Sequence, residues 1–377
     1  MAFTFYNPVR ITFGSGKLNE LGTLCARYGK KALLVTAPNS EDVLRPLYDR
    51  VKAILAEAGV TVVHFDEVVP NPVVQGIEKA IAMVKAEGAE MVVAVGGGSS
   101  MDSAKAISLL YSLDERPWND LYSAYDSPFA RYGTIGEGAL PLICVPTTSG
   151  TGSEVTQCLV ISDETTTDKM SIFHPDAFAA EAVIDPELTV SMPARLTAVS
   201  GFDAFSHAFE SYMRAEEGSY ASVLAVNAMQ AVADALPALV KDLTNLQLRE
   251  KMSLAAMWAG ISLSNAGAMA AHPLSELVSG ICPRIAHGQA LACLYPAFSA
   301  FQQTKTPDKC AKVAQILGGD SLPEAMAAFI RAIGLGQSLT ELGVTAEERD
   351  ALCNHFLLGV LPFGTKDELT TIMRGAF

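Results

Sequence analysis

Short apolar runs alternate with helical stretches along the first half of the chain. The segment between residues 73 and 88 has apolar residues at helical spacing. Runs rich in β-branched residues predict strands at residues 32–36, 61–65, 91–95 and 142–146. This alternation is typical of a parallel sheet whose strands are joined by crossover helices. We therefore expect the first half to be an α/β domain.

The pattern changes after Pro193. Long stretches rich in Ala, Leu and Met follow one another with almost no alternation, which predicts an all-helical second part. The expected domains are residues 1–192 and 193–377, and because no low-complexity linker separates them we expect a substantial interface. Two further runs, at residues 156–162 and 169–173, flank the polar segment DETTTD and predict a β-hairpin.

Composition indicates a folded protein that does not bind nucleic acid. Half of the 377 residues are apolar and 18% are charged, which allows a sizeable core. The net charge of −14, without any Lys/Arg-rich run, would repel phosphate backbones and anionic lipid. The uncharged stretch from Ser253 to Ala271 is long enough to span a membrane, but its small residues favour a buried helix.

The cysteines and the first residues predict a cytoplasmic location. The chain has seven cysteines, an odd number without any CxxC pair, so we expect reduced and mostly buried thiols. The opening residues lack a positive region followed by an apolar one, and no secretory signal is visible. Both observations fit a reducing compartment.

Two glycine-rich turns follow predicted strands. Gly96, Gly97 and Gly98 precede a helix that begins with Ser99, and such a turn brings backbone N–H groups close to a phosphate. A tight turn with a Ser cap is the alternative. The second turn, VPTTSGTGSEVT at residues 145–156, is rich in hydroxyl groups, although it could be a polar surface loop. Ligands of open α/β sheets lie at the carboxyl ends of strands, so the two turns together favour a diphosphate.

One aspartate and three histidines form a candidate metal site. Asp203 and His207 are four residues apart on a predicted helix and share one face of it. His272 follows at the end of the uncharged stretch, and His287 begins the next predicted helix. Three imidazoles and one carboxylate suit Zn²⁺ or Fe²⁺. Each could instead be an ordinary helix residue, but an uncharged environment makes burial without a partner costly.

The remaining histidines lack such neighbours. We expect His64 and His355 to be structural, whereas His174, beside Pro175, could either be structural or border the site.

These segments together resemble the iron-containing alcohol dehydrogenase family, which includes lactaldehyde reductases and propanediol dehydrogenases. The motifs in order are FGSGKL, PNP at 70–72, GGGSSMD, PTTSGTGSEVT, DPELTVSMP, DAFSHAFE, AHP and AHG, and they cover nearly the whole chain. The resemblance implies an α/β dinucleotide-binding domain and an all-α metal-binding domain, as in dehydroquinate synthase, with a cleft between them.

Carried over by position, the resemblance implies four metal ligands, which are Asp203, His207, His272 and His287. It also implies a set of cofactor contacts: Asn71, Gly96, Gly97, Gly98, Ser99, Asp102, Thr147, Thr148, Thr156, Lys169 and Leu188. The implied activity is hydride transfer between NAD or NADP and a small aldehyde or alcohol, with Fe²⁺ or Zn²⁺ as Lewis acid. A homodimer or larger homo-oligomer is expected.

The chain departs from the family pattern at three places. Ala37 follows the first predicted strand where NAD-using relatives often have Asp, so NADP is a candidate. Arg284 lies three residues before His287, and we hypothesise that it faces the substrate and favours an anionic aldehyde, the alternative being a surface arginine. His272 and His287 are fifteen residues apart, close to the usual family spacing but a residue longer.

Other functions stay open at this point. A metal-independent reductase such as a maleylacetate reductase, or a lyase like dehydroquinate synthase, belongs to the same superfamily, but the complete Asp/His set argues against the metal-free version. A phosphotransferase would use the glycine turns for ATP, yet the chain has no P-loop lysine. A non-catalytic binding module would leave the histidines unexplained.

Overall fold

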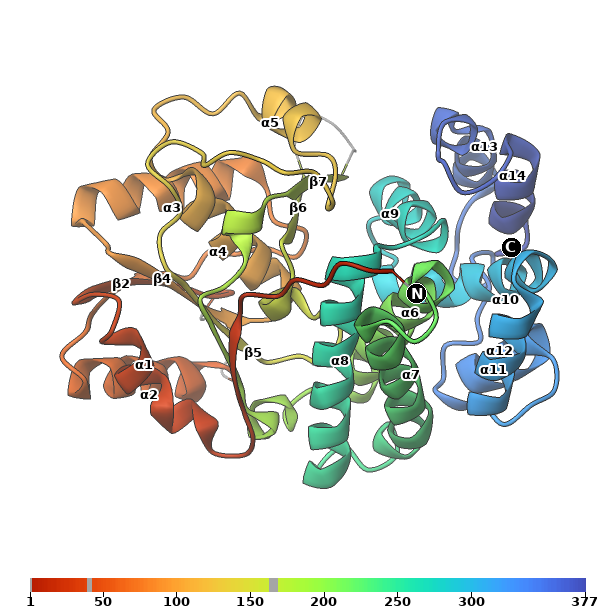
Figure 1. The fold of residues 1–377 in the computed structure, drawn as a ribbon, viewed down its shortest axis with the longest axis horizontal. Coiled ribbons are helices and arrows are strands. Elements are labelled where there is room, and N and C mark those ends of the chain that lie inside the picture. Colours follow the sequence, from red (N-terminus) through yellow and green to blue (C-terminus); the bar gives the residue numbers. More distant parts are fainter. Residues whose placement is uncertain (1, 39–42, 163–168) are drawn as a thin grey trace. The chain divides into compact units, whose positions relative to one another are not determined.

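A computed structural model describes residues 2–38, 43–162 and 169–377. The chain forms two compact units, residues 6–191 and residues 192–377, and residues 2–5 group with the second (Figure 1). The sequence analysis assigns residues 2–5 to the first domain, whereas their contacts group them with the helical unit. The rings of Phe3 and Phe5 lie 5.6 and 5.3 Å from that of Tyr220, so aromatic packing ties this segment to the helical unit. That each unit is an independently folding domain stays a prediction.

The first unit contains a six-stranded parallel sheet with the order β1-β8-β5-β4-β2-β3. Its strands are β1 (Arg10–Phe13), β2 (Lys31–Val35), β3 (Thr61–Phe65), β4 (Met91–Gly96), β5 (Leu142–Pro146) and β8 (Glu181–Ile184). The four predicted strands are confirmed. The prediction missed β1 and β8, which are four residues each and too short to establish a periodic pattern.

Helices cover both faces of the sheet, as parallel strands require. Residues of β4 alternate between two apolar clusters, with Val92 packing on one side and Val93 on the other. The first cluster includes residues of α3 (Val74–Glu87) and α4 (Gly98–Leu110), and the second includes residues of α1 (Leu21–Cys25) and α2 (Arg45–Glu57). A buried β4 with an apolar side chain on each face explains its continuous apolar sequence.

The predicted hairpin is confirmed. Strands β6 (Cys158–Ser162) and β7 (Lys169–Phe173) pair antiparallel, with Val160 opposite Ser171. The polar segment predicted between them, residues 163–168, lies outside the described residues. The described part of the unit also contains a short helix, α5 (Trp118–Ala124), and four 3₁₀ segments: η1 (Lys17–Glu20), η2 (Ser153–Val155), η3 (Pro175–Ala177) and η4 (Pro186–Thr189).

Among its described residues, the second unit contains helices and connecting loops but no strand. Its helices are α6 (Ala194–Arg214), α7 (Tyr220–Leu239), α8 (Leu246–Ala266), α9 (Ala271–Ile281), α10 (His287–Lys305), α11 (Pro307–Ile316), α12 (Leu322–Ala332), α13 (Ala346–Asn354) and α14 (Lys366–Arg374), with the 3₁₀ segment η5 (Phe356–Gly359). Helix α6 carries a row of buried aromatic side chains, Phe202, Phe205 and Phe209. These rings pack against Tyr295 and other aromatic rings. This row anchors α6 in the centre of the unit.

Both ends of α6 are fixed by cations from other helices. The buried Arg249 of α8 donates to the Met192 carbonyl and the Thr197 hydroxyl beside the first turn. Lys309 of α11 donates to the last carbonyls of the helix, those of Tyr212, Met213 and Ala215. Cations are favourable at a helix C-terminus because its carbonyl groups are unpaired and carry negative charge. Both ends of helix α6 are therefore held in place by hydrogen bonds from neighbouring helices.

The uncharged stretch from Ser253 to Ala271 is interrupted rather than one helix. Helix α8 ends at Ala266, Gly267 follows with φ 79°, and α9 begins at Ala271. Among the described residues, α7 is long and apolar enough to cross a membrane, with half of its apolar window buried, and α8 with α9 passes the same test but is bent by 107°. Core helices of soluble proteins also pass this test, so the finding is weak evidence for a membrane span.

Candidate functional site

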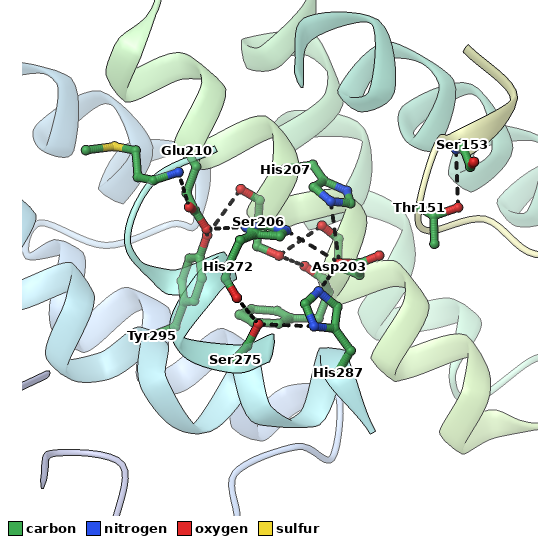
Figure 2. A network of polar contacts seen from close by, with 12 residues as sticks. Thr151, Ser153, Asp203, Ser206, His207, Glu210, His272, Ser275, His287 and Tyr295 are labelled. Atoms are coloured by element: carbon green, nitrogen blue, oxygen red, sulfur yellow. Dashed lines mark hydrogen bonds and ion pairs between the residues drawn. The ribbon is translucent and has the colours of Figure 1, made fainter. Parts of the chain in front are cut away.

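The four candidate metal ligands converge within the helical unit. Asp203 and His207 lie one turn apart on α6, His272 lies in the first turn of α9, and His287 is the first residue of α10. The Nε2 atoms of the three histidines surround Oδ1 of Asp203 at 3.8, 3.8 and 3.5 Å respectively (Figure 2). His272, at the end of the uncharged stretch, does not continue the helix that precedes it, because the chain bends at Gly267 and His272 lies in α9.

These separations suit a shared ion better than direct hydrogen bonds. Distances of 3.5–3.8 Å exceed those of ordinary N–H···O bonds. Ligands bound tetrahedrally about 2.1 Å from one ion lie roughly 3.4 Å from one another. Asp203 Oδ1 and His272 Nε2 are both buried and have no hydrogen-bond partner among the described residues. Because such orphaned atoms are costly, the donor set fits a divalent ion, and Asp203, His207 and His272 are close enough to hold one.

Protonation of the cluster follows from burial and mutual charge. Burial raises the pKa of Asp203, but the histidines around it outweigh burial and hold that pKa well below its ordinary value. Burial lowers the pKa of His207 to about 4, against the opposing effect of Asp203. Asp203 is therefore ionised and His207 neutral near pH 7, which are the states in which carboxylates and imidazoles bind metals.

Two polar side chains behind the cluster were missed by the sequence analysis. Oε1 of Glu210 lies 2.6 Å from Nδ1 of His272, and the Ser275 hydroxyl lies 3.1 Å from Nδ1 of His287 (Figure 2). Burial lowers the pKa of His272, but Glu210 and Asp203 outweigh burial and raise it to about 10, so an ion that binds Nε2 has to displace a proton from it. Glu210 lies seven residues after Asp203 on the same helix, so the spacing of two acidic residues in an apolar helix was a usable signal.

The two glycine-rich turns meet at the carboxyl edge of the sheet. Strands β4 and β5 are neighbours, and the Thr147 amide donates to the Gly96 carbonyl at 2.9 Å. A Cβ added to Gly98 would lie 2.7 Å from Cγ2 of Thr151, too close to be tolerated without movement. Thr151 in turn accepts a hydrogen bond from the Ser153 amide at 3.2 Å (Figure 2). Glycine at position 98 therefore allows the two turns to touch.

The N-terminus of α4 is suited to an anion. Gly97 is its N-cap, with extended backbone, and no side chain within the described parts of the chain caps the helix. By contrast, α13 and α14 begin with complete capping boxes from Thr345 and Thr365. Unpaired N–H groups and the helix dipole favour a phosphate at such an end. The predicted contacts Gly97, Gly98 and Ser99 all lie here, half-buried.

A buried lysine connects the two turns. Lys105 of α4 donates through Nζ to Ser153 Oγ at 2.8 Å, to Thr156 Oγ1 at 3.0 Å and to the Cys158 carbonyl at 2.7 Å. Asp102 accepts from the Ser153 hydroxyl and from the Val160 amide. Asp102 and Thr156, which the sequence analysis expects to contact the cofactor, thus have partners inside the protein. Sequence reasoning missed Lys105, although the only cation in this helix, three residues after Asp102, was visible.

The other predicted cofactor residues occupy varied positions in the first unit. Asn71 is exposed and has φ 54°, a left-handed conformation that Asn tolerates better than most residues. Thr148 is half-buried and lies 3.3 Å from where a Cβ of Gly97 would be. Lys169 begins β7, and Leu188 is nearly buried in η4 within the core cluster that includes α1 and α2.

Outside the cluster, the described histidines have structural partners. His64 lies 2.9 Å from the Thr36 hydroxyl, and His355 caps η5 by accepting from the Leu357 amide. His174, whose role the sequence left open, accepts from the Asp176 amide through Nδ1 and donates through Nε2 to the Gly133 carbonyl. Both ring nitrogens of His174 are therefore used within the fold.

Arg284, which we hypothesised to face the substrate, is ion-paired within the protein, and a substrate role for it stays a prediction. Its guanidinium group makes a two-pronged ion pair with Glu348 at 2.7 and 2.6 Å and donates to the Gly343 carbonyl at 2.9 Å. All of these partners lie at or just before the start of α13. The planar guanidinium is therefore committed to a structural pair, as the fork geometry of Arg and carboxylate favours.

A parallel sheet with phosphate-suited turns, together with a carboxylate and three imidazoles, is typical of metal-dependent oxidoreductases that use a dinucleotide. Residues 8–186 match the family model described as iron-containing alcohol dehydrogenase, and residues 197–371 match that of the C-terminal part of the Fe-containing alcohol dehydrogenase family. The chain belongs to the iron-containing alcohol dehydrogenase family and is an enzyme of that family.

Similar proteins agree with this assignment. A choline dehydrogenase from Bacillus subtilis (strain 168) is 37% identical over 321 residues, which are 84% of this chain and 77% of that protein. A 1,3-propanediol dehydrogenase from Klebsiella pneumoniae is 31% identical over 392 residues, covering 100% of this chain and 99% of that protein. The structure of a sulfoacetaldehyde reductase from Bifidobacterium kashiwanohense in complex with NAD⁺ has 27% identity and a TM-score of 0.85, covering 100% and 99% of the two chains.

Proposed function

We propose that the chain oxidises a small alcohol, or reduces the matching aldehyde, with one divalent ion held by Asp203, His207, His272 and His287. The observation that carries this proposal is the convergence of three imidazole Nε2 atoms on one carboxylate oxygen at 3.5–3.8 Å, with buried atoms left unpaired. An ion bound there, Fe²⁺ or Zn²⁺, supplies a Lewis acid for the substrate oxygen, and a nicotinamide cofactor supplies or accepts the hydride.

The protein's own residues bind and orient these groups. Asp203 contributes the negative charge that offsets the ion, and the neutral His207 contributes a lone pair without charge repulsion. The turns at Gly96–Gly98 and at residues 147–151 offer backbone N–H groups and hydroxyls to the cofactor diphosphate. Lys105 binds the second turn to α4, and these hydrogen bonds fix the position of one turn relative to the other.

The cofactor can be NAD or NADP. β2 is followed by Thr36 and Ala37, and the absence of a carboxylate at position 37 removes the repulsion that would disfavour a 2′-phosphate. The related sulfoacetaldehyde reductase was solved with NAD⁺, which supports NAD equally. The substrate is a small aldehyde or alcohol, and the pairing of Arg284 with Glu348 leaves no specific argument for an anionic one. We further propose a homodimer or larger homo-oligomer in the cytoplasm.

Metal reconstitution tests the proposal. The purified chain is stripped with a chelator and reloaded with Fe²⁺ or Zn²⁺ without oxygen, and oxidation of NADH and NADPH is followed with a panel of neutral and anionic aldehydes. We expect turnover only after reloading, with similar preference for neutral and anionic members of equal size. Turnover by the stripped chain would instead indicate a metal-independent reductase. If neither cofactor is oxidised although both bind, the proposed chemistry is wrong.

A further inference from the structure

Four polar side chains lie along one stripe of α6. Asp203, His207, Glu210 and Arg214 are spaced by four, three and four residues, which places them on one face of the helix. The first two belong to the proposed metal site. The last two have no place in that site, although Glu210 is completely buried. A buried carboxylate requires several hydrogen bonds to offset the cost of its burial.

Glu210 has three hydrogen-bond donors directed at its carboxylate (Figure 2). Oε2 accepts from the Met269 amide at 2.5 Å, and Oε1 accepts from Nδ1–H of His272 at 2.6 Å. The Tyr295 hydroxyl lies 3.2 Å from Oε1 as well. Short bonds of this kind are typical of an ionised acceptor. Both carboxylate oxygens are used, and each holds a different part of the segment that carries His272.

The turn between α8 and α9 is held by the same stripe. Arg214 donates through Nε to the Ala266 carbonyl at 2.7 Å, at the end of α8. Glu210 then holds Met269 three residues later, and α9 begins at Ala271. The direction of the chain changes by 107° here, so small movements of the turn would displace His272 considerably. Arg214 and Glu210 thus fix the position of the turn, and only Glu210 also touches the ring.

We infer that Glu210 is a positioning residue for the metal site: it binds the Nδ1–H group of His272 and holds the ring so that Nε2 faces Asp203. This inference rests on the proposed metal site. A carboxylate behind a ligating histidine fixes the tautomer and the ring orientation and makes the other nitrogen a stronger donor. Among the described residues, Nδ1 of His287 has the neutral Ser275 hydroxyl as its partner and Nδ1 of His207 has none. His272 is therefore the most strongly polarised of the three imidazoles.

Glu210→Gln separates this role from simple packing. The amide has nearly the same shape, but its single oxygen can accept from only one side of the group. If that oxygen faces His272, the NH₂ group opposes the Met269 amide. If it faces Met269, the NH₂ group opposes Nδ1–H, and the ring must move its proton to Nε2, the atom that would bind the ion. Either arrangement impairs the site.

Competition titration of the stripped chain with Zn²⁺ against a coloured chelator measures the effect. We expect Glu210→Gln to weaken Zn²⁺ binding by about 10–100-fold, the range found for such partners. Tyr295→Phe is the matched control, since it removes one of the three donors without opposing Nδ1–H, and should change affinity by less than about threefold. Equal affinity in Glu210→Gln and wild type, or an equal loss in Tyr295→Phe, would overturn the inference.

Two further measurements separate the possible failures. If His207→Ala binds Zn²⁺ as tightly as wild type, the proposed site itself is wrong, whatever Glu210 does. Circular dichroism shows whether Glu210→Gln folds. If it does not, NMR of the Zn²⁺-loaded wild type with ¹⁵N-labelled histidine tests whether Nδ1 of His272 carries a proton. A strongly downfield Nδ1–H proton that disappears in His272→Asn supports the inference, whereas a His272 ring without a proton on Nδ1 refutes it.

Discussion

Gly288→Ala should damage the metal site without changing any proposed ligand. Gly288 follows His287 in the first turn of α10, where that helix meets α6. A Cβ added there would lie 2.1 Å from the Val199 carbonyl oxygen and 2.8 Å from its carbon. A carbon-to-oxygen contact needs roughly 3.3 Å, so the two helices would have to separate by about 1 Å.

That displacement is large for a metal ligand. Bond lengths in such sites vary by only about 0.2 Å, and His287 would move together with its neighbour. We expect Zn²⁺ affinity to fall at least about tenfold and turnover of the reloaded enzyme to fall with it. Overpacking of this kind also costs about 1–3 kcal/mol of folding free energy. In a unit of this size that corresponds to a melting temperature lower by about 2–4 °C per kcal/mol.

The assay compares Zn²⁺ competition titrations and thermal melts of wild type, Gly288→Ala and a control. Gly76→Ala is the control because it lies inside α3 and its nearest atom would be 4.0 Å away. The control should bind Zn²⁺ normally and be stabilised by up to about 1 kcal/mol. Wild-type affinity and melting temperature in Gly288→Ala would refute the argument that close contact of α6 and α10 fixes His287.

Three further predictions follow from the same structure. Arg284→Ala should alter kinetics equally on neutral and anionic aldehydes, because the guanidinium is paired with Glu348; a selective loss on anionic substrates would restore the substrate role. Lys105→Met should weaken nicotinamide nucleotide binding at least about tenfold by leaving buried acceptors unpaired, with Zn²⁺ binding unchanged, and calorimetric titration of both ligands checks this. Burial raises the pKa of Glu154 to about 7, so ionisation costs more in the folded chain than in the unfolded one. The contribution of Glu154 to the free energy of unfolding should therefore fall as pH rises from about 4.5 to about 7 and then level off. Thermal melts of Glu154→Gln should not show this fall with pH.

The fold could be predicted where the local pattern was strong. Strands such as β4 are continuous apolar runs because both faces are covered, and the five-residue run at 91–95 was sufficient to identify it. Strand β8 could not be found in this way, since it contains only four residues and begins with the buried Glu181. The bend between α8 and α9 was missed because its residues, Gly267 to Ala270, resemble the small residues of the flanking helices.

The site was only partly accessible from the sequence. The Asp203 and His207 pair shares a helix, so periodicity alone places both side chains together. His272 and His287 reach the same point through a turn and a helix start, which local patterns do not specify, and the family resemblance was needed to link them. The pairing of Arg284 with Glu348 joins residues 64 apart, and no local signal distinguishes it from an arginine that faces a substrate.

Diffraction at the iron absorption edge would test the central claim most directly. Crystals of the chain loaded with Fe²⁺ without oxygen should give one anomalous peak per chain, bounded by Oδ1 of Asp203 and by Nε2 of His207, His272 and His287 at about 2.0–2.2 Å. A strong peak at another place in the chain would contradict the account. So would a peak at this site with two or more of these four atoms outside bonding distance.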